Sequence, residues 1–195
     1  MLKSQRLVEL LIALVLFTGV LSLSFAEREQ TELASKLIRL HVVANSDSAA
    51  DQTYKLEVRD QLLAELAPVL NGSESREDAE NRLSSALPEL RRKLFPGIAL
   101  TLTAERFPER QYDTFNLPAG EYTALRAVIG SGEGKNWWCV LFPPLCVEAV
   151  TEFDSEDAFA LLSDDEVELI TGSDKGYVVK FKVLEIIERL REAFR

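Results

Sequence analysis

Apolar residues recur along this chain with two spacings, one typical of strands and one typical of helices. The order of the segments with each spacing restricts the fold class. Residues 98–107 place an apolar side chain at every second position, which is typical of a half-buried strand. Residues 48–70 carry Val58, Leu62 and Leu66 along one side, which predicts an amphipathic helix. The predicted order is a strand, two helices, three strands and further helices, at 37–45, 48–70, 75–95, 98–107, 121–130, 137–143, 155–171 and 179–194. Because strands and helices are grouped, we expect an α+β fold with a small, largely antiparallel sheet and helices packed on one face.

Turn and cap residues mark the boundaries of these elements. Serine followed three residues later by an acidic residue, the capping-box pattern, occurs at Ser48–Asp51, Ser75–Asp78 and Ser163–Glu166. The Asn71–Gly72 pair predicts the end of the first helix, and Pro88 predicts a kink or restart in the second. The glycine-rich residues 130–136 predict a tight turn that pairs the strands on either side of it as a hairpin.

The N-terminus has the three-part layout of a secretory signal. Lys3 and Arg6 form a basic segment, residues 10–23 are largely apolar, and small residues precede Glu27. We therefore predict that residues 1–26 are a signal peptide cleaved between Ala26 and Glu27. Retention of the apolar segment as an uncleaved anchor is the alternative.

Residues 27–195 are then expected to form a single secreted α+β domain, in which residues 27–36 are a polar lead-in. The chain carries a formal net charge of −10. Nucleic acids and anionic lipids would repel such a domain, so we expect no nucleic-acid partner and no direct lipid binding after the signal is removed.

Residue types that carry chemistry are sparse. His41 is the only histidine, and the cysteines lack the spacing of a structural zinc site, so we expect no metal and no cofactor. The glycines of residues 130–136 do not have the spacing of a phosphate-binding loop. His41 could pair with Cys139 or Cys146 as a nucleophilic dyad, and paired carboxylates are a second route to catalysis. A secreted hydrolase acting on cell-wall material therefore stays open as an alternative function.

Both cysteines lie in one short segment, Cys139 and Cys146. Pro143 and Pro144 turn the chain between them, so the two Cα atoms could approach to the ~5.5 Å that a disulfide needs. We predict that disulfide, with two buried free thiols as the alternative.

The strand at 137–142 is apolar on both faces. Simple alternation places Trp137, Cys139 and Leu141 on one face and Trp138, Val140 and Phe142 on the other. Helices on one side of the sheet would bury only one of these faces, so we expect the other to be open or covered by a partner. The candidate partner-binding residues are three aromatic side chains of this strand and two residues of the loop after the first strand, namely Trp137, Trp138, Phe142, Asn45 and Asp47.

At these segments the chain resembles the stage II sporulation protein R family. The resemblance runs through LIRLHVVANSDSAADQ, KLEVRD, LPAGEYTALRAVIGSGEGKNWWCVLFPPLC and VKFKVLE. It implies a messenger and not an enzyme. Such a protein is made in the forespore and exported into the space between the two septal membranes. There it activates a membrane-embedded aspartic protease that removes the pro-sequence of sigma-E, which would be the partner of this chain. The resemblance supplies no catalytic residue.

Overall fold

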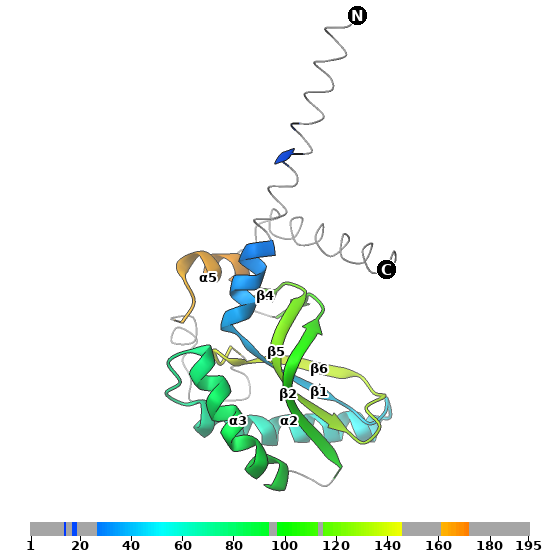
Figure 1. Ribbon diagram of the computed structural model, residues 1–195. Coiled ribbons are helices and arrows are strands. Elements are labelled where there is room, and N and C mark those ends of the chain that lie inside the picture. The colour runs from blue at the N-terminus through cyan, green and yellow to red at the C-terminus, as the bar shows by residue number, and fades with distance from the viewer. Residues whose placement is uncertain are drawn as a thin grey trace, which may run out of the picture.

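The computed structural model describes residues 14, 17–18, 27–93, 97–112, 115–145 and 161–171. The helices shown in Figure 1 are α2 (Ala49–Leu70), α3 (Arg76–Lys93) and α5 (Asp164–Thr171). Residues 27–36 are also helical, and we call them the N-terminal helix. The strands are β1 (Ile38–Val43), β2 (Ile98–Phe107), β3 (Arg110–Gln111), β4 (Asn116–Leu117), β5 (Gly120–Ile129) and β6 (Asn136–Phe142).

Four strands form a mixed sheet in the order β2-β5-β1-β6, and β3 and β4 form a separate two-stranded ribbon. The β2–β5 and β1–β6 pairs are antiparallel, whereas β1 runs parallel to β5. The parallel pair is possible because two helices and three strands separate β1 from β5 in the chain, which is ample length for a crossover. The predicted hairpin is wrong: β6 pairs with β1, which lies between β5 and β6.

One face of the sheet packs against α2 and α3. Ile38, Leu40 and Val42 of β1 alternate onto this face and are fully buried with Leu62 of α2 and Leu83 of α3. We call it the α2/α3 face. Removing this apolar area from water stabilises the main core of the domain.

The opposite face is also covered at one end. Leu33 of the N-terminal helix and Ile170 of α5 are buried in a second cluster with Ala124 of β5 and Val140 of β6. Figure 1 shows α5 and the N-terminal helix together, at the other side of the sheet from α2 and α3. The prediction that helices pack on only one face is therefore wrong, and the lead-in at 27–36 is a helix with a buried side.

A break in the β1–β6 register changes which side chains share a face. Ile38 pairs with Phe142 but Arg39 pairs with Val140, so Leu141 has no partner of its own in the ladder. This irregularity turns Phe142 onto the α2/α3 face, whereas Trp138 lies on the opposite face. The predicted common face for Trp138 and Phe142 is wrong for this reason.

The predicted capping interactions are confirmed. Ser48 Oγ accepts a hydrogen bond from the Asp51 amide at 3.2 Å, and Ser75 Oγ accepts one from the Asp78 amide at 3.2 Å. At α5 the Ser163 amide donates to Glu166 at 2.8 Å, which closes the reciprocal pair. Asn71 and Gly72 end α2, where Gly72 has a φ of +70°. The helix α3 continues through Pro88 as one element.

The predicted signal peptide lies outside the described residues except for residues 14 and 17–18. The signal sequence and its cleavage therefore stay predictions. Within the part of the chain that the structure describes, no helix combines the length and apolarity needed to span a bilayer.

Candidate functional site

The loop after β1 and the glycine-rich loop before β6 bind each other at one end of the sheet. Asn45 Nδ2 donates to Asp51 Oδ2 at 3.0 Å, and Asn45 Oδ1 accepts from the Ser131 amide at 3.0 Å. Asp47 Oδ1 accepts from the Lys135 amide at 2.8 Å. We call residues 45–51 together with 130–135 the loop clasp. Its hydrogen bonds to Ser131 and Lys135 join segments that are more than 80 residues apart in the chain.

Glycines make this close approach possible. A Cβ on Gly130 would lie 2.3 Å from Asn45 Oδ1, and a Cβ on Gly134 would lie 2.3 Å from the carbonyl oxygen of Ser46. Gly130 also has a φ of +56°, which disfavours other residues. The glycine-rich loop is therefore shaped to cross the end of β1.

Buried polar groups complete the clasp. Lys55 Nζ donates to Gln52 Oε1 at 2.8 Å and to the Lys135 carbonyl at 3.1 Å. Burial lowers the pKa of Lys55, and the nearby Asp47 partly opposes that effect. Hydrogen bonds from Ser46 and Asn45 lower the pKa of Asp51.

Asn45 and Asp47, which we predicted to contact a partner, thus have partners inside the domain. These hydrogen bonds give Asn45 and Asp47 a structural role, which is enough to explain why polar side chains occur at both positions. Contact with a second protein stays a prediction for both.

The two tryptophans of β6 lie on different faces of the sheet, and both are partly buried. The guanidinium carbon of Arg59 lies 5.0 Å from the Trp137 ring centre on the α2/α3 face. On the opposite face, the guanidinium carbon of Arg110 lies only 3.7 Å from the Trp138 ring centre, and His41 stacks on Trp138 at 5.5 Å. Each tryptophan is therefore paired with an arginine.

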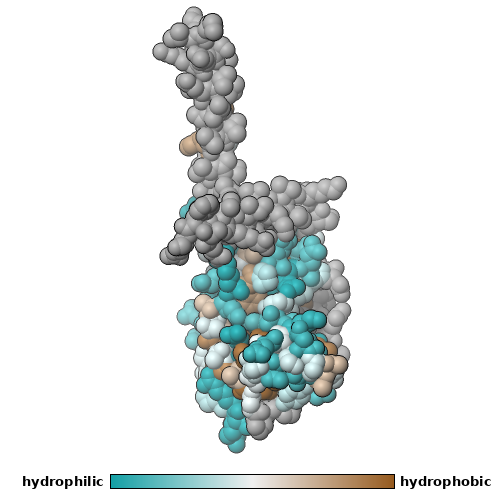
Figure 2. All heavy atoms as spheres, turned by 90° about the vertical axis from the view of Figure 1, so that its right-hand side faces the viewer, coloured by the Kyte–Doolittle hydropathy of each residue, from teal (hydrophilic) through white to brown (hydrophobic). Residues whose placement is uncertain are grey.

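The apolar face expected on this strand is not open. Val140 is 1% exposed and Phe142 is 4% exposed, so neither offers a surface to a partner. Figure 2 shows one side of the molecule, where hydrophilic side chains cover much of the described surface and hydrophobic ones form small patches. Of the aromatic candidates, only the two tryptophans reach solvent.

His41 lies beneath Trp138, and both of its ring nitrogens are engaged. Nδ1 lies 2.9 Å from Glu105 Oε1, and Nε2 lies 2.8 Å from Asn136 Oδ1. Cys139 is buried on the α2/α3 face, and His41 is on the other, so a dyad of these two residues is wrong. Cys146 lies outside the described residues. Within the described chain no group of three or more histidine, cysteine and acidic residues could hold a metal ion.

Arg39, two residues before His41, is a feature that sequence reasoning missed. It is 0% exposed, and its Nη2 donates to the hydroxyl of Tyr112 at 2.6 Å. Burial lowers the pKa of Arg39, and the positive charge of Arg110 lowers it further. The available signal was the alternation of Arg39 and His41 with Ile38, Leu40 and Val42 in β1.

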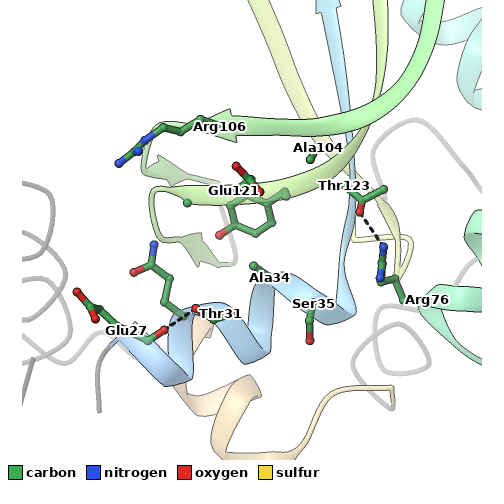
Figure 3. Close-up of a pocket in the computed structure, with 12 residues that line it drawn as sticks. Glu27, Thr31, Ala34, Ser35, Arg76, Ala104, Arg106, Glu121 and Thr123 are labelled. Atoms are coloured by element: carbon green, nitrogen blue, oxygen red, sulfur yellow. Dashed lines mark hydrogen bonds between the residues drawn. The ribbon is translucent and has the colours of Figure 1, made fainter. Parts of the chain in front are cut away.

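A polar cavity of about 540 Å³ lies under the N-terminal helix at the ends of β2 and β5 (Figure 3). Arg76 reaches it from α3 and donates to Thr123 Oγ1 at 2.8 Å, as Figure 3 shows. Two arginines and two glutamates contribute to its described lining, namely Arg76, Arg106, Glu27 and Glu121. The described lining contains no histidine or cysteine, so the candidate dyads do not meet there.

Comparison with known proteins identifies the family. The family model described as stage II sporulation protein R matches residues 34–152, from the N-terminal helix past β6. The chain belongs to the stage II sporulation protein R family. The stage II sporulation protein R of Bacillus subtilis (strain 168) is 31% identical over 192 aligned residues, which cover 85% of this chain and 86% of that protein. No solved structure matches the chain.

Membership confirms the resemblance and places this chain among sporulation proteins. The loop clasp, His41, Arg39 and both tryptophans all lie within the span that matches the stage II sporulation protein R family. Glu27 is the first described residue of the N-terminal helix and lines the polar cavity, whereas Ala26 is not described. Of the predicted partner-binding residues, Asn45 and Asp47 lie in the loop clasp, whereas Trp137 and Trp138 lie on opposite faces of β6.

Proposed function

We propose that this chain is an exported signalling protein of sporulation that activates a membrane-embedded aspartic protease, which then removes the pro-sequence of sigma-E. The observation that carries the proposal is family membership over most of the chain. The family description names a stage of sporulation and no reaction. Activation of the protease is the step that the proposal adds.

The proposed route is export across the forespore membrane into the intermembrane space. The layout of residues 1–26 supports it, since a basic segment, an apolar segment and small residues precede Glu27. N-terminal sequencing of the exported protein should begin at Glu27. Recovery of Met1 on membrane-bound material would instead favour an uncleaved anchor.

The surroundings of His41 favour a binding role over hydrolysis. Both ring nitrogens already face oxygen atoms within the domain. No serine, threonine or cysteine side chain among the described residues is hydrogen-bonded to the ring. Nucleophilic catalysis needs such a group within hydrogen-bond reach of its base.

A disulfide between Cys139 and Cys146 is part of the proposal. Cys139 is fully buried at the position where β6 pairs with β1, so a cross-link there would hold the strand in its register. Mass spectrometry after alkylation should detect two thiols only when the protein is reduced first. Alkylation of both thiols in denatured, unreduced protein would contradict the cross-link.

Co-expression tests the signalling role. The full chain, the protease and the pro-sigma substrate are produced together, and shortening of the substrate is followed by gel mobility. Processing is expected only when all three are present, and substitution of the catalytic aspartate of the protease should abolish it. Equal processing with and without this chain would contradict the proposal.

A further inference from the structure

The opposite face of the sheet holds a buried cation, Arg39, for which the described residues supply no anion. Arg39 is 0% exposed, and its Nε and Nη1 atoms are buried with no hydrogen-bond partner among the described residues. No described carboxylate forms an ion pair with it, and its one hydrogen bond goes to the Tyr112 hydroxyl. An unpaired buried charge is costly to stability. A feature that costs stability points to a role outside folding.

Aromatic rings hold this guanidinium in place. Its central carbon lies 4.1 Å from the ring centre of Phe107 and 5.0 Å from that of Tyr122. Such contacts attract a cation but do not neutralise it. The positive charge of Arg39 therefore persists in a setting that screens it poorly.

A second unpaired arginine lies nearby. Arg110 stacks on Trp138 at 3.7 Å, and among the described residues its Nε has no hydrogen-bond partner and its guanidinium no ion pair. The Tyr112 hydroxyl connects Arg39 to the residue on which Arg110 stacks. It accepts a hydrogen bond from Arg39 and donates one to the Trp138 carbonyl at 3.3 Å. We call Arg39, Arg110 and Trp138 the arginine–tryptophan site.

The neighbouring charges do not balance this site. The Glu105 carboxylate contacts His41 and also forms an ion pair with Arg126. Arg126 Nε lies 3.5 Å from Glu105 Oε1. Among the described residues, Glu105 is the carboxylate that contacts the polar side chains of this sheet face, where Arg39, Arg110 and Arg126 lie, and the buried Glu166 of α5 on the same side is already paired with Lys36. Such a local excess of positive charge attracts an anion that can approach this one face.

We propose that the arginine–tryptophan site binds a carboxylate side chain in an acidic segment of the partner protein. Arg110 would donate to the carboxylate, Arg39 would add positive potential from beneath, and Trp138 would hold the Arg110 guanidinium in position by stacking. Arginine and tryptophan are the residue types that most often dominate binding energy at interfaces. The inference rests on the proposed function, because it takes the partner to be the receiver of the signal. An anionic bilayer is disfavoured as the ligand, since the acidic domain as a whole would be repelled from it.

The test measures binding of a fluorescein-labelled hexaglutamate peptide to the purified full chain by fluorescence anisotropy. Arg110→Gln should weaken binding by at least about tenfold, because a hydrogen bond between charged groups is lost. Arg110→Glu should abolish it. Arg59→Gln is the matched control, since Arg59 stacks on Trp137 on the other face of the same strand, and it should bind as the wild type does.

Three results of the binding measurements would overturn the inference. They are absence of hexaglutamate binding at low ionic strength, equal binding by Arg110→Gln and Arg59→Gln, and Arg110-dependent binding of inorganic phosphate or of phosphatidylserine vesicles in place of the peptide. The co-expression assay keeps the two proposals distinct. If Arg110→Glu supports as much processing as the wild type, the proposed site is wrong and the signalling role is unaffected. If the wild-type chain supports no processing, the signalling role is wrong.

Discussion

At the scale of single residues, β1 contains two charged or polar side chains that point to the same side of an otherwise aliphatic strand. Arg39 and His41 are 0% and 6% exposed, and both lie against Phe107. His41 has oxygen partners for its two nitrogens, whereas Arg39 has one hydroxyl. The two residues therefore differ: described residues supply partners for both ring nitrogens of His41, but for only one nitrogen of the Arg39 guanidinium.

His41→Ala should lower the free energy of unfolding by about 1–3 kcal/mol, because two hydrogen bonds and two ring contacts are lost while Glu105 and Asn136 lose a partner. Urea denaturation measures the change. Signalling in the co-expression assay should fall only as far as the folded fraction falls. A stably folded His41→Ala protein with no signalling at all would instead indicate catalysis.

At the scale of elements, the loop clasp fixes where β6 begins relative to β1. The amides of residues 131 and 135 donate to Asn45 and Asp47, and these hydrogen bonds hold the glycine-rich loop across the end of β1. The Gly134 amide also donates to the Ala44 carbonyl at 2.9 Å. Two requirements therefore select glycine in this loop. One is the positive φ of Gly130, and the other is the close contact of Gly130 and Gly134 with residues 45 and 46, which are distant in sequence.

Two glycine substitutions separate the effect of the positive φ from the effect of the close contact. Gly130→Ala and Gly72→Ala both place a side chain at a positive φ, which costs roughly 1 kcal/mol. Only at Gly130 does the added Cβ also collide with Asn45, and overpacking of that kind costs a further ~1–3 kcal/mol. Urea denaturation should rank Gly130→Ala as the less stable variant. Equal losses would mean that Asn45 moves aside and the clasp is loose.

The clasp also makes stability depend on pH. Hydrogen bonds from Ser46 and Asn45 lower the folded-state pKa of Asp51 below its unfolded value. Its contribution is therefore present above the unfolded pKa of about 4 and is lost as pH falls through the folded pKa. The loss of unfolding free energy between pH 7 and pH 3 should be smaller in Asp51→Asn than in the wild type. Asp60→Asn, elsewhere on α2, controls for the charge change, and the same reduction in both variants would rule out a specific role for Asp51.

At the scale of the whole molecule, the sheet separates two apolar clusters that different helices cover. The cluster with α2 and α3 contains most of the buried β1 and β5 aliphatic residues. The second cluster joins the N-terminal helix and α5 to the far ends of β5 and β6. The segment that would follow signal cleavage is thus part of a core.

Leu33→Ala tests whether the N-terminal helix is part of the folded core. Leu33 is 0% exposed in the second cluster, so its truncation should lower the free energy of unfolding by about 2–5 kcal/mol. Leu56→Ala on α2 removes the same atoms from a side chain that is 39% exposed and should cost well under half as much. Equal effects in urea denaturation would show that the N-terminal helix adds little to the fold.

The sequence by itself determined the order of β1, α2, α3, β2, β5 and β6, the start and end of α2, the starts of α3 and α5, and the family. The N-terminal helix and the β3–β4 ribbon were not predicted, and the helix predicted at 179–194 lies outside the described residues. Caps and periodicity depend on contacts within three or four residues, as at Ser48 and Asp51, so they can be recognised locally. Turn residues such as Asn45 and Asp47 were found for the same reason, although the structure shows that their hydrogen bonds go to a distant loop.

Only the tertiary structure decided the strand order, the sheet face that each side chain occupies, and the burial of Arg39 without an ion pair among the described residues. Whether β6 pairs with β5 or β1 is a choice between contacts far apart in the chain, and one register break was enough to move Phe142 to the other face. Arg39 and Arg110 look like ordinary surface charges in a sequence. Their meaning depends on what covers them, because burial removes the water that would otherwise solvate a charge, and burial arises only when the helices, the ribbon and the sheet come together.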